Sequence, residues 1–306
     1  MQIDGFLFFI IVIAFGYLAV KTKLVADSAA DHLSGILLNL CFPAMLLKNF
    51  INTDTEQLLH SGLTAAIVSL VFSLLPFFVC LFVFRRAESE KKLLFRYILS
   101  VGNTSFVCIP LMSLFLNSEQ MMIVIVHGAV MDILIWGVHH QLFLGSNSSN
   151  WKEIMKKIFS SPCLLAVLLG VILCIANVRL PSFLSYTIDA LAATVSPLAL
   201  LFIGMLICRY GLFGWIKCRD AIFYSLWRVI VYPCLVFAIL CWFLPLQSAL
   251  ILAIVFGSPA PISAVLWCKE YGRDTRLVVN CLIPSTILYF LVMGTLLLIL
   301  THCCVL

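Results

Sequence analysis

The sequence is poor in charged residues. Only 11% of its 306 residues are Asp, Glu, Lys or Arg, whereas 63% are hydrophobic. A soluble globular domain carries about a quarter charged residues, and even a 300-residue soluble domain leaves about a quarter of its chain surface in water. This composition excludes an ordinary soluble fold and predicts a chain that is embedded in a lipid bilayer.

Paired cysteine motifs are also missing. The 13 cysteines include no CxxC pair and lie mostly inside apolar runs, where a free cysteine acts as a small hydrophobic residue. We therefore expect neither a disulfide framework nor a metal site, and no cofactor beyond a coupling ion. The formal charge of +5 does not indicate a nucleic-acid partner, because the basic residues gather in the short breaks between apolar runs.

Long apolar segments are what the sequence has in abundance. A membrane-spanning helix needs about 20 mostly apolar residues, and ten segments meet or approach that length. They are residues 3–20, 32–50, 61–84, 93–116, 121–143, 162–178, 186–208, 219–243, 247–268 and 277–301. The sequence thus predicts an all-α polytopic membrane protein with ten transmembrane helices.

The distribution of basic residues supports this count. Cytoplasmic loops collect Lys and Arg, and when the first loop is placed inside, the odd-numbered loops hold 16 of the 19 basic residues. A miscount by one helix would destroy this alternation. We therefore expect both termini to be extracytoplasmic and the loop at 85–96 to be cytoplasmic.

The chain contains an internal repeat. A glycine and a proline 27 residues apart occur twice at an offset of 154, as Gly16 with Pro43 and as Gly170 with Pro197. An offset of 155 aligns Gly102–Thr104 with Gly257–Pro259. Because each copy holds five helices, an odd number, the second copy enters the membrane in the opposite orientation. We predict two inverted five-helix repeats at 1–145 and 162–306, joined by a cytoplasmic linker at 146–161.

The fourth and ninth predicted helices are interrupted midway by glycine, small polar residues and proline. The candidate substrate-binding residues there are Gly102, Asn103, Thr104, Pro110, Ser258, Pro259 and Pro261. A proline within a helix frees the carbonyl four residues earlier, so Pro259 is expected to free that of Val255. Such backbone is tolerated in a membrane only when it is buried in protein or faces water. Paired breaks in corresponding helices of two halves therefore indicate a transport site.

The geometry of these breaks indicates what they bind. If both helices unwind and cross at mid-depth, the positive ends of their second halves face a common region. That region suits an anion, above all a carboxylate. The free carbonyls at the ends of the first halves suit a cation or a proton-bearing group.

Two charged residues lie deep within predicted helices. Asp132 is in the middle of the fifth, and Arg228 is about ten residues into the eighth. Charged groups at that depth are costly and are functional candidates by default. Asp132 has two interpretations. In the functional one it carries a proton or anchors the site, and in the structural one it is a polar bridge between helices. Arg228 is suited to neutralise a carboxylate, and Asp132 is one candidate partner.

Four stretches carry a resemblance to a known family. They are residues 38–47, 102–111, 196–205 and 259–272. In these stretches the chain resembles the auxin efflux carrier family, which includes plant PIN carriers and bacterial putative malate permeases. The resemblance covers essentially the whole chain. It implies a ten-helix inverted repeat whose helices four and nine cross at their prolines, and carboxylate substrates near that crossing with Asn103 as a contact.

The resemblance also bears on location. Many PIN carriers have a long hydrophilic loop between their halves, whereas this chain has only about residues 145–161 there. The chain therefore looks like the compact prokaryotic form of the family. This resemblance implies that it lies in a plasma membrane, namely the bacterial cytoplasmic membrane.

The favoured function is secondary transport of small organic anions by alternating access. The direction of transport, proton or sodium coupling, and assembly as a homodimer stay open. A rival hypothesis is an intramembrane enzyme that uses Asp132 with His139 or His140. Asp132 and His139, however, are about 10 Å apart along an ideal helix, too far for a direct pair. A cation-coupled symporter of another substrate class and a receptor or scaffold are further alternatives.

Overall fold

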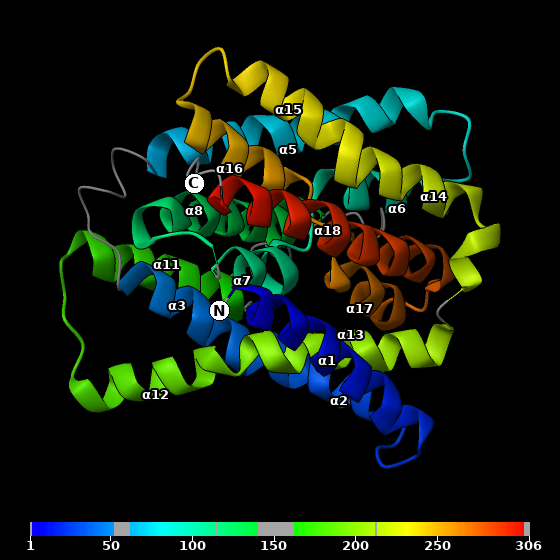
Figure 1. Cartoon of the computed structure of the whole chain (residues 1–306), viewed down its shortest axis with the longest axis horizontal. Helices are drawn as coiled ribbons and strands as arrows, with labels where there is room; N and C mark the ends of the chain where they lie inside the picture. Colours follow the sequence, from blue (N-terminus) through cyan, green and yellow to red (C-terminus); the bar gives the residue numbers. More distant parts are fainter. Residues whose placement is uncertain (1, 52–61, 114, 140–161, 212, 303–306) are drawn as a thin grey trace, which may run out of the picture. The chain divides into compact units, whose positions relative to one another are not determined.

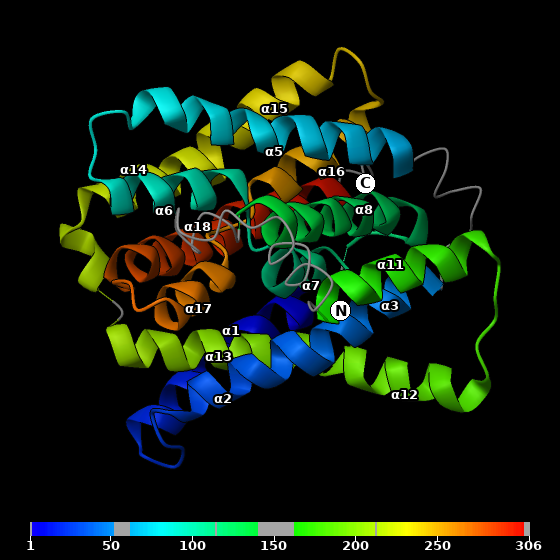
Figure 2. The ribbon, with the colours of Figure 1, turned by 180° about the vertical axis from the view of Figure 1, so that it is seen from behind.

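A computed structural model describes residues 2–51, 62–113, 115–139, 162–211 and 213–302 (Figures 1 and 2). Every regular element in these ranges is a helix. All ten apolar segments predicted from the sequence contain helix wherever they are described, which confirms the all-α class. The predicted linker at 146–161 lies outside the described residues.

Five helical stretches are long and apolar enough to cross a membrane, judged by length and composition within the described ranges. They are Ala29–Ile51, Leu63–Val83, Ser182–Tyr210, Arg219–Leu240 and Arg276–Leu296. Two shorter apolar helices, Leu7–Lys21 and Leu246–Phe256, add to them. The chain is therefore a membrane-embedded helical protein, and the count of ten spans stays a prediction.

The chain divides into two compact units that interleave along the sequence. The first unit comprises Met1–Leu7, Thr64–Met131 and Tyr210–Leu306, and the second comprises Phe8–Leu63 and Asp132–Arg209. Each unit therefore takes helices from both halves of the predicted repeat. The predicted repeat divides the chain by sequence similarity, whereas the two units divide it by spatial contacts. The units therefore do not test the repeat.

The second unit is built around a crossing of two helices through glycine. Its elements are α1 (Gln2–Lys21), α2 (Ala29–Ile36), η1 (Leu37–Cys41), α3 (Phe42–Ile51), η4 (Ile135–His139), α11 (Pro162–Ile175), α12 (Ser182–Ala193) and α13 (Val195–Tyr210). A Cβ atom added to Gly16 of α1 would lie 2.2 Å from the carbonyl oxygen of Leu201. One added to Gly204 of α13 would lie 2.1 Å from that of Ile13. The backbones of α1 and α13 are thus in contact, which only glycine permits.

The first unit contains the two interrupted helices. Its elements are α5 (Leu63–Val83), α6 (Ser89–Ser100), η3 (Thr104–Cys108), α7 (Ile109–Met112), α8 (Ser118–Leu134), η5 (Gly214–Lys217), α14 (Arg219–Leu226), η6 (Trp227–Val231), α15 (Tyr232–Leu240), α16 (Leu246–Phe256), α17 (Ile262–Glu270) and α18 (Arg276–His302). The boundaries between the units fall inside helices: α1 after Leu7, α5 after Leu63, α8 after Met131 and α13 after Arg209. The fourth predicted span corresponds to α6, η3 and α7, and the ninth to α16 and α17.

Prolines set the local helix geometry in both units. The π-helical turns η1, η3 and η6 each end two residues before a proline, at Pro43, Pro110 and Pro233. A proline ring clashes with the carbonyl of the preceding turn of an α-helix and offers no amide hydrogen. A wider π turn gives that ring room, and such turns occur frequently at functional sites.

Candidate functional site

The two interrupted helices meet at their breaks, inside the first unit. The helix α6 ends at Ser100, and the chain is non-helical through Asn103 before η3 begins. The helix α16 ends at Phe256, and α17 begins at Ile262. The backbone amide of Asn103 donates a 2.8 Å hydrogen bond to the carbonyl oxygen of Pro259. The structure therefore confirms the two predicted breaks and their contact, which we call the junction (residues 101–104 and 257–261).

Neighbouring helices hold the junction in place. The amide of Ala260 donates to the hydroxyl oxygen of Ser285 in α18 at 3.1 Å, and that hydroxyl lies 2.6 Å from the carbonyl oxygen of Cys281, to which it donates. The hydroxyl groups of Tyr97 and Ser263 lie 2.6 Å apart and link α6 to α17. These bonds satisfy buried polar groups that would otherwise be costly in a membrane protein.

The most buried charge at the junction is the guanidinium of Arg228. Its side chain is only 1% exposed. Its Nε donates to the carbonyl oxygen of Ser258 at 2.9 Å, and its Nη1 donates to that of Leu99 at 2.8 Å. Among the described residues of the first unit, no carboxylate lies within salt-bridge distance of it. Within this described part of the chain, the buried cation Arg228 is hydrogen-bonded only to neutral carbonyl groups.

Tyr224, one helical turn before Arg228, also bonds a carbonyl group of α6. The hydroxyl of Tyr224 donates to the carbonyl oxygen of Ile98 at 2.9 Å. Residues four apart share one face of a helix, so one face of α14 and η6 supplies partners to two of the last carbonyls of α6. Sequence reasoning singled out Arg228 but missed Tyr224, because a tyrosine in an apolar segment carries no signal of which group it will bond.

Gly102 allows the two breaks to approach this closely. A Cβ atom at this position would lie 1.9 Å from Ser258 Oγ and 2.5 Å from Arg228 Nη2. These two atoms therefore stand beside the same point of the backbone. Any side chain larger than hydrogen would displace both of them.

Four buried polar atoms at the junction have no hydrogen-bond partner within the described chain. They are Asn103 Nδ2, Thr104 Oγ1, Arg228 Nη2 and Ser258 Oγ. Their residues are at most 3% exposed. Buried polar groups are nearly always bonded, and exceptions call for an explanation such as a missing ligand. Three of these residues, Asn103, Thr104 and Ser258, are among the substrate-binding candidates predicted from the sequence.

The prolines act differently from the prediction. We expected Pro259 to leave the carbonyl of Val255 free, but that oxygen accepts the amide of Ser258 at 3.0 Å. The expectation was wrong because α16 ends by tight turns before the proline instead of continuing as a kinked helix. Pro259 supplies the acceptor for Asn103, and Pro261 occupies the N-cap position of α17. Pro110 lies within α7, and its side chain is outside the described residues.

Asp132 belongs to the second unit, so its predicted pairing with Arg228 stays a prediction. The side chain is 3% exposed, and its Oδ2 has no hydrogen-bond partner within the described chain. His139, the other member of the hypothetical catalytic pair, places Nδ1 2.8 Å from the carbonyl oxygen of Leu134 in its own helix. That bond gives the ring a structural partner.

A second buried histidine lies in the first unit. His127 of α8 is fully buried in the first unit, with its Nδ1 2.9 Å from the hydroxyl oxygen of Ser69. Its ring packs edge-on against Phe256, the last residue of α16, with centroids 4.8 Å apart. His127 therefore links α5 and α8 to α16, the helix that ends at the junction.

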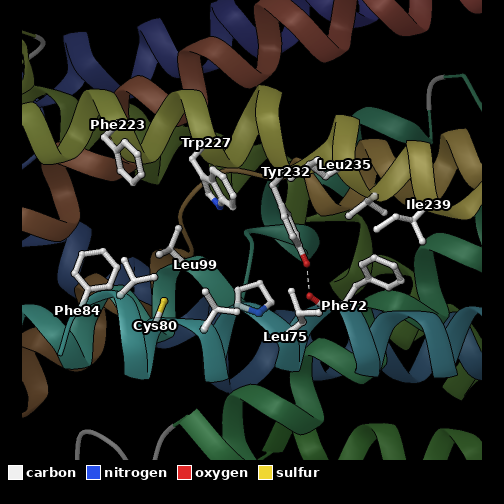
Figure 3. Close-up of a pocket in the computed structure, with 14 residues that line it drawn as sticks. Phe72, Leu75, Cys80, Phe84, Leu99, Phe223, Trp227, Tyr232, Leu235 and Ile239 are labelled. Atoms are coloured by element: carbon white, nitrogen blue, oxygen red, sulfur yellow. Dashed lines mark hydrogen bonds between the residues drawn. The ribbon is translucent and has the colours of Figure 1, made fainter.

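An apolar groove of about 370 Å³ runs along the same unit, between α5 on one side and α14, η6 and α15 on the other (Figure 3). Its lining is aliphatic and aromatic: Phe72, Leu75, Pro76, Val79, Cys80, Val83, Phe84, Leu99, Phe223, Trp227, Tyr232, Leu235, Val236 and Ile239. The hydroxyl of Tyr232 donates to the carbonyl oxygen of Phe72 (Figure 3). No charged side chain lines the groove, so it suits hydrocarbon and not a carboxylate.

No cluster of potential metal ligands occurs among the described residues. The junction instead offers hydrogen-bond donors and a positive charge. Such a set can bind an anion through charge-assisted hydrogen bonds, which are about twice as strong as neutral ones.

Comparison with known proteins indicates the family to which the chain belongs. No curated protein matches the chain significantly. The model of one family, described as membrane transport protein, matches residues 3–297 and thus nearly the whole sequence. That match includes both interrupted helices, the first nine predicted apolar segments and all but the last four residues of the tenth. The chain therefore belongs to this membrane transport protein family, the family of the auxin efflux carriers.

Proposed function

We propose that the protein is a secondary transporter that moves small organic anions, chiefly carboxylates, across the membrane by alternating access. The observation that carries the proposal is the charge state of the junction. Among the described residues of the first unit, the buried guanidinium has no carboxylate partner, and four buried polar atoms, its own Nη2 among them, have no hydrogen-bond partner. An anion bound at the junction would supply both the missing charge and the missing acceptors.

The helix ends at the junction favour the same ligand. A helix carries about half a positive charge at its N-terminus and half a negative charge at its C-terminus. The C-terminal ends of α6 and α16 are compensated by Arg228, which bonds carbonyls at both of them. The beginning of α17 and of the helical run at 104–112 are not compensated by any acidic side chain in their first turns. The net field of the site is therefore positive.

Asn103 is proposed as the main contact of the substrate carboxylate. Its backbone is fixed by the bond to Pro259, while its amide Nδ2 is left unpaired. The hydroxyl of Thr104 follows directly on the chain and is also unpaired. A fixed backbone with free side-chain donors is what a binding site needs, because little conformational freedom is lost when the ligand binds.

The architecture that goes with this function is two inverted repeats of five transmembrane helices, with both termini extracytoplasmic and the chain in the plasma membrane. The basic residues of the odd-numbered loops and the paired breaks support it. Cysteine labelling tests the orientation: on a cysteine-free background, a Ser89→Cys variant should react with a membrane-impermeant reagent only after the cells are opened. Reaction in intact cells would contradict the topology.

Uptake into proteoliposomes tests the transport function. Purified protein should accumulate or exchange labelled monocarboxylates or dicarboxylates, and an excess of the unlabelled anion should compete with them. Neutral amides of the same acids should compete poorly, because the site is positively charged and lacks a carboxylate. Failure to move any carboxylate, with the protein correctly folded and inserted, would refute the proposal.

A further inference from the structure

The carbonyl groups at the two breaks are the natural place for a coupling cation. Unwound backbone carbonyls and the negative ends of half-helices coordinate the sodium ion or proton in transporters with broken helices. Here α6 and α16 end at one junction, and one side chain reaches carbonyl groups at both ends. Such a site would draw its ligands from the carbonyls of residues near Leu99 and Ser258.

In this protein the side chain of Arg228 already bonds these carbonyl groups. Arg228 donates from Nε to the carbonyl oxygen of Ser258 at 2.9 Å and from Nη1 to that of Leu99 at 2.8 Å. One planar guanidinium thus bridges the ends of both broken helices, with its charge 5.8 Å from the centre of the Tyr232 ring. Its third nitrogen, Nη2, stands beside Gly102 and Ser258 Oγ.

A free cation could not share this position. It would have to displace the guanidinium from both carbonyls, or sit against another positive charge in a site from which water is excluded. Like charges repel strongly in such a low-dielectric environment. An arginine side chain is charged in proteins, so it supplies a permanent positive charge.

We infer that Arg228 is a tethered cation that replaces a coupling sodium ion at the junction, so that this carrier binds its anion without sodium. The inference rests on the proposed function and names the positioning residue of that site. The positive charge belongs to the protein and stays with it throughout the transport cycle. A bound monovalent anion would neutralise it, whereas a sodium-coupled site must recruit its charge from solution each time.

Thermal unfolding of the purified protein tests the inference without relying on transport. A ligand that binds only the folded state raises the melting temperature. The melting temperature of the wild type should be the same in sodium chloride and in choline chloride at equal ionic strength. Arg228→Met removes the charge and exposes both carbonyls, so the variant should melt lower and should be restabilised by sodium or by methylguanidinium, but not by methylurea.

A matched variant controls for the loss of another arginine of the first unit. Arg96 lies in α6 with its guanidinium carbon 4.1 Å from the centre of the Phe77 ring, and it does not bond the carbonyls at the breaks. Arg96→Met should show no cation-specific stabilisation. Sodium stabilisation of the wild type would overturn the inference, as would an Arg228→Met protein that no small cation stabilises.

Transport separates this inference from the function on which it rests. Carboxylate uptake by the wild type should proceed equally with sodium, potassium or choline as the only cation, and Arg228→Met should lower it at least about tenfold, the effect of losing bonds to a charged group. Uptake that requires sodium would overturn the inference and leave the carrier function intact. If Arg228→Met does not fold, the wild-type measurements in the different salts still test the inference. Sodium stabilisation of the wild type, or uptake that requires sodium, would contradict it.

Discussion

At the scale of the residue, the junction is a set of side chains whose bonding is incomplete. Asn103 and Arg228 each use part of their hydrogen-bonding capacity within the protein and keep one donor nitrogen unpaired. In a membrane-embedded protein an unpaired buried donor costs several kcal/mol. Groups kept at that cost are explained when a substrate completes their bonding during part of the transport cycle.

Substitution of Asn103 tests its role as a substrate contact. Asn103→Leu keeps a similar volume but removes both hydrogen-bonding functions. The loss of a hydrogen bond to a charged group costs about 1.5–3 kcal/mol, so the apparent affinity for the carboxylate should fall by roughly ten- to a hundredfold. Substrate concentration series of uptake in proteoliposomes measure this change.

The matched control for that experiment is Asn39→Leu. Asn39 is exposed, and its Nδ2 donates to the carbonyl oxygen of Gly35 in its own helix, so its loss should leave affinity unchanged. An Asn103→Leu carrier with the affinity of the wild type would remove Asn103 from the site.

Gly102 offers a steric test at the same place. In Gly102→Ala the new methyl group would fall 1.9 Å from Ser258 Oγ and 2.5 Å from Arg228 Nη2. Both atoms must move, so the variant should insert into the membrane but transport at a much reduced rate. Gly214→Ala in the same unit is the control, because the nearest atom to its Cβ is 3.7 Å away. Equal uptake by the two variants would show that the close approach is not required.

At the scale of the element, the sequence allowed most of the helices and both interruptions to be predicted. Long apolar segments separated by charged breaks locate helices reliably in a membrane protein, and the clusters at Gly102–Thr104 and Gly257–Pro261 marked the breaks. The way each break is bonded could not be predicted. The acceptor for the amide of Asn103 is on Pro259, and the donor for Leu99 is Arg228 of a third helix. Such partners are distant in sequence and are set by packing.

The role of proline at the breaks shows the same limit. A proline pattern predicts where a regular helix is disturbed, but the chain can respond with a kink, a π turn or a complete interruption. Around Pro110 and Pro233 it forms π turns, whereas before Pro259 the helix ends. Which response occurs depends on the neighbouring elements that bond the released groups, and one sequence does not contain that information.

The crossing of α1 and α13 yields a prediction about stability. The Cβ of Gly16→Ala would lie 2.2 Å from the carbonyl oxygen of Leu201, and no flexible side chain is there to give way. Overpacking of this kind costs about 1–3 kcal/mol, so the variant should melt at a lower temperature in detergent. In Gly35→Ala nothing lies within 4 Å of the new atom, and stability should be retained or slightly increased. A Gly16→Ala protein as stable as the wild type would contradict the tight crossing.

At the scale of the whole molecule, the two units contain different candidate functional groups. The whole junction, with Asn103, Arg228 and Ser258, lies in the first unit, which draws helices from both halves of the chain. The site can therefore keep its geometry if that unit moves as one body during transport. The second unit contains Asp132, a buried acidic group whose Oδ2 is unpaired within the described chain.

Coupling to a gradient is a property of the complete cycle, and Asp132 is the residue at which to test it. If Asp132 carries a proton, Asp132→Asn should still bind the anion and exchange it, because the junction is unchanged. The variant should then fail to concentrate the anion when a proton gradient is imposed across the vesicle membrane. Parallel measurements of exchange and of gradient-driven accumulation in the same vesicles separate these two abilities.

The control for this last experiment is Asp189→Asn in the same unit. Asp189 forms a 3.0 Å salt bridge with Lys48, and its side chain is about half exposed (49%). An exposed pair of this kind contributes only about 0–1 kcal/mol, so the variant should fold and accumulate the anion as the wild type does. Accumulation by Asp132→Asn at the wild-type level would show that the proton is carried elsewhere. Loss of both exchange and accumulation in Asp132→Asn, with folding intact, would instead assign Asp132 to substrate binding or to the structure of the second unit.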